Sequence, residues 1–308
     1  TEAFTPNGVA LGFVHAENWV RPDPPSGSKK ERQNERKSKS IDQKESGRWV
    51  RSYDAVCQLK SQASETQFVY VADSESDIYE MIAQGNLQSD QADFVIRACQ
   101  NRALQSAPVD RDDSDQRLSQ YLFDAAKKRP VLYTQKVQVR ARTSQKVKAD
   151  KSQKRKQNRD AREANIEVRA TPVTLRAPKR RGETLPDITV HAVFAEERNV
   201  PEGEIPVRWV LLTSLPITDD VQVYRIIEYY QIRWLIEINF RTLKSLFKVE
   251  SLQFETLDRY LTCFAVYMIA TWRAMYICYY SRTSPDASCE QVFERSEWRS
   301  VYQFVHEK

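Results

Sequence analysis

The chain has 308 residues, of which 41% are hydrophobic, and its formal net charge is +5 at pH 7. This composition excludes an intrinsically disordered chain and is typical of a globular protein with one or two domains. Its basic residues include two dense runs, at 29–39 and 146–162. A single run of this kind is commonly a solvated loop, but the two together favour a polyanionic partner.

The five cysteines and three histidines are scattered, with no CxxC pair and no histidine cluster. Neither a zinc site nor a disulfide framework is therefore predicted, which favours the reducing cytoplasm. The apolar segment 261–280 is long enough to span a bilayer, but Arg273 lies inside it. We therefore expect a buried core helix there and no contact with a membrane.

In chain order, the first 100 residues predict an α/β architecture. A strand is expected within 9–20, a flexible basic loop over 22–46 and a helix over 46–63. The segment "QFVYVADSESDIYEMIAQ" at 67–84 has the pattern of a buried strand, an acidic turn and a helix. The next buried strand is expected at 92–100.

The pattern changes near residue 130, where short apolar or alternating segments are separated by turn residues. These segments are 131–142, 165–178, 187–197 and 207–216. They predict an antiparallel sheet inserted in the α/β domain. From residue 219 onward the pattern is helical, first over 219–247 and then over 256–281.

The helix expected over 229–247 carries an unusual row of polar residues. At 3.6 residues per turn, four of them fall within a stripe roughly 60° wide. They are Tyr230, Arg233, Glu237 and Lys244. Aromatic residues flank the stripe, and a carboxylate beside apolar surface is costly unless a cation or a metal ion compensates it. The plainer alternative is a solvated ion pair between Arg233 and Glu237.

A second carboxylate, Asp73, follows the strand "FVYVA" at its carboxyl end. Ligands of α/β sheets usually bind at that edge. Asp73 could instead cap the helix that follows, although Asp77 is the more natural cap. Two carboxylates, one from a strand end and one from a helix, suit Mg²⁺ or Mn²⁺. Two such ions about 4 Å apart can drive phosphoryl transfer, with basic side chains on the nucleic-acid phosphates.

Three motifs resemble those of bacterial DDE transposases of the insertion-sequence-four branch, which includes the enzyme of the fifth transposon. The polar row matches the branch signature Tyr-x2-Arg-x3-Glu-x6-Lys in all four residues and all three gaps. The segment "VADSESDIYEM" at 71–81 resembles the family's strand, catalytic Asp and acidic turn. The segment "RWVLLTS" at 208–214 precedes the glutamate helix at the family's usual distance.

The resemblance extends from about residue 9 to 300 and implies a fold class. This is an α/β fold with an RNase H-like catalytic core, interrupted by an antiparallel β-rich insertion and followed by helices. The implied parts are a first part of the core at 1–127, the insertion at 128–216, a return to the core at 217–250 and an incomplete helical dimerisation domain at 251–308.

The resemblance also implies the chemistry and the partners. Asp73 and Glu237 would be catalytic carboxylates of the DDE triad and ligands of two Mg²⁺ or Mn²⁺ ions. The reaction would be cut-and-paste transposition, in which DNA strands are cleaved at transposon ends and transferred. The partners would be double-stranded DNA, at terminal inverted repeats and at the target, and a second copy of the chain in a homodimer. The location would be the bacterial cytoplasm.

By the same resemblance, five further residues would bind DNA. Tyr230, Arg233 and Lys244 would contact phosphates at the transposon end. Trp209 would stack on a base flipped from the cleaved end, where stacking offsets the cost of flipping. Its alternative is a strand aromatic in the core. Arg97 matches a family position near the active site.

The family's first catalytic Asp lies on a strand upstream of the one expected within 9–20, and neither Glu2 nor Asp23 has that context. We therefore expect an N-terminally truncated transposase that is catalytically inactive by itself. Two alternatives stay open: an inactive DNA-binding or inhibitory fragment, and an unrelated RNase H-like nuclease, for instance one acting on RNA.

Overall fold

The computed structural model describes residues 1–19, 27–87, 90–105, 121–139, 141, 160–179 and 184–306. Most of the second basic run, 146–159, lies outside these residues. The chain forms two compact units. The sheet unit comprises 17–230, and the helical unit comprises 1–16 together with 231–308.

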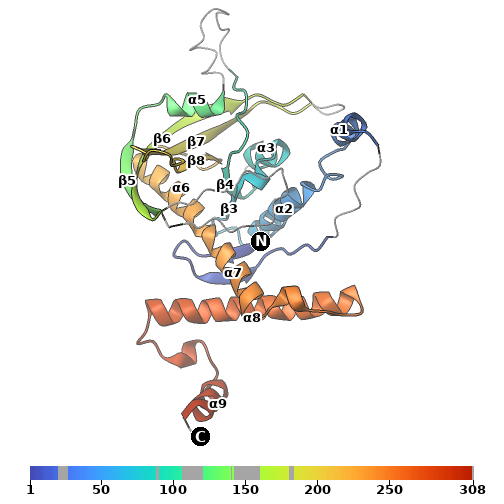
Figure 1. Ribbon diagram of the computed structural model, residues 1–308, viewed down its shortest axis with the longest axis vertical. Coiled ribbons are helices and arrows are strands. Elements are labelled where there is room, and N and C mark those ends of the chain that lie inside the picture. Colours follow the sequence, from blue (N-terminus) through green and yellow to red (C-terminus); the bar gives the residue numbers. More distant parts are fainter. Residues whose placement is uncertain are drawn as a thin grey trace, which may run out of the picture. The chain divides into compact units, whose positions relative to one another are not determined.

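The sheet unit is built on six strands in the order β3-β4-β8-β7-β6-β5 (Figure 1). The strands are β3 Val69–Ala72, β4 Asp93–Arg97, β5 Tyr133–Val139, β6 Arg162–Leu175, β7 Ile188–Arg198 and β8 Arg208–Thr213. Only β3 and β4 are parallel, and every other neighbouring pair in this sheet is antiparallel. The predicted strands and their antiparallel pairing are confirmed.

The four later strands continue the sheet that β3 and β4 begin. Strand β8 bonds to β7 on one side and directly to β4 on the other, so one sheet runs through the whole unit. Val210, Leu211 and Leu212 are all buried. A strand buried on both faces needs a hydrogen-bonded neighbour at each edge, since no water can satisfy its backbone there. The division of the chain into its two units falls at 16/17 and 230/231.

Helices cover both faces of this sheet. The helices of the unit are α1 Lys29–Ser38, α2 Gly47–Gln62, the 3-10 helix η1 Ser74–Ser76, α3 Tyr79–Leu87, α5 Leu122–Lys127 and most of α6 Asp220–Ile232. On one face, Val95 of β4 belongs to a buried cluster with Val223 and Ile227 of α6. On the other, a Cβ on Gly85 of α3 would stand 2.9 Å from the Phe94 ring. Alternate residues of β4 thus face different helices, which explains its uninterrupted apolar sequence.

The prediction of a loop over 22–46 is wrong for Lys29–Ser38, which form α1. A capping box begins this helix: the Ser28 hydroxyl accepts from the Glu31 N–H, and the Glu31 carboxylate accepts from the Ser28 N–H. This box satisfies two backbone N–H donors at the helix start without any apolar contact. The helix predicted over 46–63 is confirmed as α2.

The helical unit contains a β-hairpin and the carboxyl-terminal helices. Its elements are β1 Glu2–Phe4, β2 Ala10–Phe13, α7 Trp234–Ser245, η2 Val249–Ser251, α8 Leu257–Thr283, η3 Cys289–Gln291 and α9 Arg295–His306. The hairpin is tied to α8 by the Trp272 indole, which donates to the Ala10 carbonyl at 2.8 Å. The continuous helix expected over 219–247 is interrupted at Arg233, where α6 ends and α7 begins.

The segment 261–280 is helical, but the prediction that this helix is buried in the core is wrong. Of the 27 residues of α8 only Thr271 is buried, and Leu257, Val266 and Ile269 are each more than half exposed. Burial needs packing partners, and within this unit α8 packs chiefly against α7 and β2. By length and composition alone α8 could cross a membrane, but one such helix is weak evidence. Arg273 inside it pairs with Glu297 at 2.8 Å.

A buried polar pair joins the hairpin to α7. The Asn239 amide, in a residue that is 1% exposed, donates to the Glu2 carboxylate at 2.9 Å. Burial raises the pKa of Glu2 from 4.5 to about 7, although the Asn239 hydrogen bond opposes this shift. The folded chain therefore holds a proton on Glu2 at pH values where the unfolded chain has lost it.

The raised pKa of Glu2 predicts that stability depends on pH, and that Glu2→Gln removes this part of the dependence. The pKa of Glu2 is higher in the folded chain than in the unfolded chain. Its contribution to the free energy of unfolding is therefore complete below pH 4.5 and is lost as pH rises through about 7. Between pH 5 and 8 the loss should be about 2 kcal/mol, after allowance for partial solvent access. Urea unfolding at both pH values measures it. In Glu2→Gln the difference between the two pH values should shrink by that amount, whereas Glu255→Gln, at an exposed position, should leave it unchanged.

Candidate active site at the sheet edge

Asp73 lies directly after β3, at the carboxyl edge of the parallel pair β3–β4. It is the N-cap of η1, where its Oδ1 accepts from the Glu75 N–H at 2.9 Å. Asp73 therefore caps a short helix through one oxygen and lies at the carboxyl edge of the sheet, where ligands of α/β sheets usually bind. Its Oδ2 has no hydrogen-bond partner among the described residues.

The acidic turn holds three carboxylates, and arginines neutralise two of them. Glu75 pairs with Arg48 at 3.0 Å. Asp77 pairs with Arg102 at 2.5 Å, and the Asp77 side chain is fully buried. Asp77 thus binds a distant loop and does not cap α3, contrary to the interpretation from sequence. Within the part of the chain that the structure describes, Asp73 is the one acid of this turn without an arginine or lysine partner.

Arg97, Trp209 and Tyr230 gather at the same edge as Asp73. Because β8 runs antiparallel to β4, its first residues lie beside the end of β4, and the Ala98 N–H donates to the Val210 carbonyl. The exposed Arg97 guanidinium donates to the Arg208 carbonyl at 3.3 Å. The half-buried Trp209 ring lies 5.9 Å from that of Tyr230, which is only 6% exposed. Tyr230 therefore supports Trp209, and its ring is mostly hidden from solvent.

The remaining predicted residues belong to the helical unit. Arg233 and Glu237 form the expected i,i+4 pair, with 3.3 Å between Nη1 and Oε1. The Glu237 side chain is 45% exposed, so it is less enclosed by aromatic residues than its sequence suggested. Lys244 pairs with Glu250 at 2.7 Å, and both side chains are largely exposed. Exposed pairs of this kind contribute about 0–1 kcal/mol, so an arriving phosphate can displace the carboxylates at little cost.

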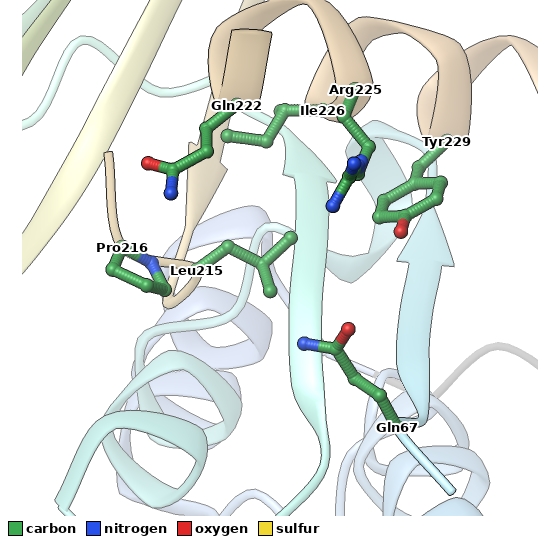
Figure 2. A pocket seen from close by; sticks show the side chains of 7 residues that line it. All are labelled: Gln67, Leu215, Pro216, Gln222, Arg225, Ile226 and Tyr229. Atoms are coloured by element: carbon green, nitrogen blue, oxygen red, sulfur yellow. The ribbon is translucent and has the colours of Figure 1, made fainter. Parts of the chain in front are cut away.

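A hollow of about 110 Å³ lies between α6 and the segments that flank β3 and β8. Figure 2 shows Gln67, which precedes β3, facing Leu215 and the α6 residues Arg225 and Tyr229. Gln67 and Asp73 flank β3 at its two ends, and Asp73 is not among the residues that line this hollow. It is no part of the candidate active site.

The donor chemistry of Asp73 and Glu237 fits a hard divalent cation. Each offers carboxylate oxygens open to solvent, the ligand type that Mg²⁺ and Mn²⁺ prefer. Asp73 and Glu237 belong to different units. Within the described residues, no group of three or more His, Cys, Asp or Glu side chains is close enough to hold a metal ion.

Comparison with known families identifies the chain. Residues 31–271, well over half of its length, match the family model of the transposase DDE domain. The chain belongs to this family. The resemblance seen in its motifs is thereby confirmed at the level of DDE transposases. Members are transposition enzymes that act on DNA and generally use divalent metal ions. The matched region of this transposase includes Asp73, Arg97, Trp209 and Glu237.

Sequence reasoning missed the two arginines that neutralise the acidic turn. Arg102 is 25 residues from Asp77 and Arg48 is 27 residues from Glu75, so no local pattern links the partners. One weak signal was available. Three acids within five residues repel one another, so some of them must acquire cationic partners in a folded chain.

Proposed function

We propose that this transposase cleaves DNA strands at transposon ends and transfers them into target DNA by a cut-and-paste route. The observation that carries the proposal is the state of Asp73: an acid at the ligand-binding edge of the sheet, with one carboxylate oxygen unoccupied by described residues. Membership of the transposase DDE domain family supports it. The fine classification, the insertion-sequence-four branch with an RNase H-like core, rests on the motif spacing.

Asp73 and Glu237 are the proposed ligands of two Mg²⁺ or Mn²⁺ ions. When bound, such ions activate the attacking oxygen and stabilise the leaving oxygen of a phosphoryl transfer. Glu237 is paired with Arg233 at 3.3 Å. That pair directs the carboxylate along one face of α7.

Arg97, Arg233 and Lys244 are the proposed phosphate contacts, and Trp209 is the proposed stacking residue. Arg97 is exposed at the same edge as Asp73. Phosphate contacts fix the position of DNA without reading its sequence. Tyr230 is proposed to act mainly by supporting the Trp209 ring, since little of its own ring meets solvent. The intact assembly is proposed to be a homodimer in the cytoplasm.

DNA binding without cleavage is the second candidate function. It is favoured by one observation: within the described residues, no group of three or more His, Cys, Asp or Glu side chains is close enough to hold a metal ion. Two-metal sites with fewer ligands bind their ions more weakly. An inhibitory role of the chain would follow from such binding. Membership of the transposase family leaves no basis for an unrelated nuclease that acts on RNA.

A nicking assay separates the two candidates. The substrate is a supercoiled plasmid that carries the gene with several hundred base pairs of its flanking DNA. We expect nicks at the element's inverted repeats with Mg²⁺ or Mn²⁺ and none with Ca²⁺. Glu237→Gln should lower the nicking rate at least about a hundredfold and leave DNA binding in Ca²⁺ intact. Binding without nicking in any metal would favour the second candidate, and nicking that ignores the repeats would refute transposon-end specificity.

The stacking role predicts a specific effect of Trp209→Leu. Base stacking on an aromatic ring contributes about 1–3 kcal/mol, so affinity for a DNA end with an unpaired terminal base should fall about tenfold. Trp209→Phe should retain most of that affinity. Fluorescence anisotropy with paired and unpaired ends measures both. Tyr224→Leu, an exposed aromatic at the other end of α6, is the control. A loss of stability without loss of affinity would instead identify Trp209 as a core residue.

A further inference from the structure

The acidic turn is tied at its far end to the loop after β4. The buried Asp77 carboxylate accepts four hydrogen bonds. Its Oδ2 accepts from the backbone N–H groups of Cys99, at 2.8 Å, and Gln100, at 2.9 Å. Its Oδ1 accepts from Nε and Nη2 of Arg102, at 3.1 and 2.5 Å. A carboxylate with this many donors is held in a single orientation.

Further contacts join the same two segments. Arg102 Nη2 and Gln100 Nε2 donate to the Asp77 carbonyl, at 2.8 and 3.1 Å. The Arg102 guanidinium also lies over the Tyr79 ring, 5.7 Å from its centroid. The Cys99 thiol lies 3.4 Å from the Ser74 carbonyl. The turn 73–77 and the loop 99–102 therefore form one rigid polar cluster, which we call the Asp77 clamp.

Asp73 depends on this clamp for its placement. Asp73 and Asp77 are the two caps of η1, so the turn between them is only three residues long. Among the described residues, the Asp73 side chain itself has one hydrogen bond, which it accepts from the Glu75 N–H. A side chain with so few contacts of its own takes its direction from the backbone beneath it. The backbone is fixed by the clamp.

We infer that Asp77 and Arg102 are positioning residues, which hold the acidic turn so that Asp73 presents its free oxygen to the divalent metal ion. The inference rests on the proposed function, because it assumes that Asp73 is a metal ligand. Supporting residues of this kind tune metal affinity by roughly 10–100-fold. The planar fork of Arg102 bonds to Oδ1 and to the main-chain carbonyl together, which a lysine cannot reproduce.

The chain offers a matched control in a second buried arginine pair. Arg162 binds Glu197 through Nε and Nη2, both at 2.9 Å, and the two side chains are 13% and 2% exposed. This pair joins β6 to β7, and Arg162 also donates to the Glu204 carboxylate and the Ile205 carbonyl. Arg102→Lys and Arg162→Lys thus remove the same kind of interaction at two places.

The test is Mn²⁺ binding by the full chain, measured by electron paramagnetic resonance of free Mn²⁺, alongside urea unfolding. We expect Arg102→Lys to weaken Mn²⁺ binding about tenfold and Asp73→Asn to weaken it at least as much. Arg162→Lys should leave Mn²⁺ affinity unchanged while lowering stability to a similar extent. Gln100→Ala, which removes one hydrogen bond of the clamp, is the milder variant if Arg102→Lys does not fold. It should weaken binding about threefold.

Three outcomes of the Mn²⁺-binding experiment would contradict the inference. Equal losses of Mn²⁺ affinity in Arg102→Lys and Arg162→Lys would reduce the clamp to a stabilising contact. Unchanged affinity in Arg102→Lys or in Gln100→Ala, with the loss in Asp73→Asn retained, would overturn the clamp and leave the proposed function standing. Unchanged affinity in Asp73→Asn would overturn the metal role of Asp73, and the clamp inference with it.

Discussion

Replacing Asp73 by asparagine is expected to slow metal-dependent DNA cleavage by at least about a hundredfold. Asparagine keeps an oxygen that can accept from the Glu75 N–H, so the cap of η1 survives. The variant loses the negative charge that a divalent ion requires, and loss of a direct ligand should cost no less than loss of a supporting residue. Cleavage of the flanking-DNA plasmid at several Mg²⁺ concentrations measures the effect.

Glu75→Gln is the control for this prediction, because Glu75 belongs to the same turn. Its side chain is 60% exposed and pairs with Arg48 at the surface. Cleavage by this variant should stay within about threefold of the wild type, since exposed ion pairs contribute little. Comparable losses in Asp73→Asn and Glu75→Gln would indicate that the turn needs only overall negative charge, and that Asp73 has no individual role.

The largest loss of stability is expected for Arg162→Met. The Glu197 carboxylate would stay buried while losing both charged hydrogen bonds, which typically costs about 3–5 kcal/mol. The double variant Arg162→Met/Glu197→Gln should recover more than half of this loss. Its neutral amide oxygen can still accept from the Val207 N–H. Urea unfolding of both variants measures the free energies.

Lys136→Met provides the surface comparison. Lys136 pairs with Glu163 at 2.7 Å on the neighbouring strands β5 and β6, and its side chain is 69% exposed. Its removal should cost less than about 1 kcal/mol. If Arg162→Met were as mild as Lys136→Met, water would have to reach Glu197 readily, and its burial would not describe the chain in solution.

Local patterns predicted most strands and helices of the sheet unit. The alternation or apolar run of each later segment reappears as β5, β6, β7 or β8, because period-2 burial is a property of neighbouring residues. The continuous helix 219–247 was harder to judge. Arg233 has helical dihedral angles, yet it separates α6 from α7. The residues around it include no glycine or proline that would predict a break.

The structural features that the sequence did not predict concern the packing of elements against one another. The apolar sequence of α8 predicted a core helix, but apolar residues become buried only where other elements cover them, and few cover α8 within its unit. The pairing between β4 and β8 was not predicted, because it joins residues more than 100 positions apart. Periodicity predicts which face of an element is buried, but it does not predict which other element packs against that face.

For the active site, the sequence by itself determined the family motifs and hence the candidates Asp73 and Glu237, since signature spacing needs no fold to be recognised. Only the tertiary structure decided which acids of the turn are neutralised. Arg48 and Arg102 reach Glu75 and Asp77 from distant segments, and the Asp77 clamp forms only when the loop after β4 packs on the turn. Electrostatic partners are chosen by distance in space, and it is the fold that sets that distance.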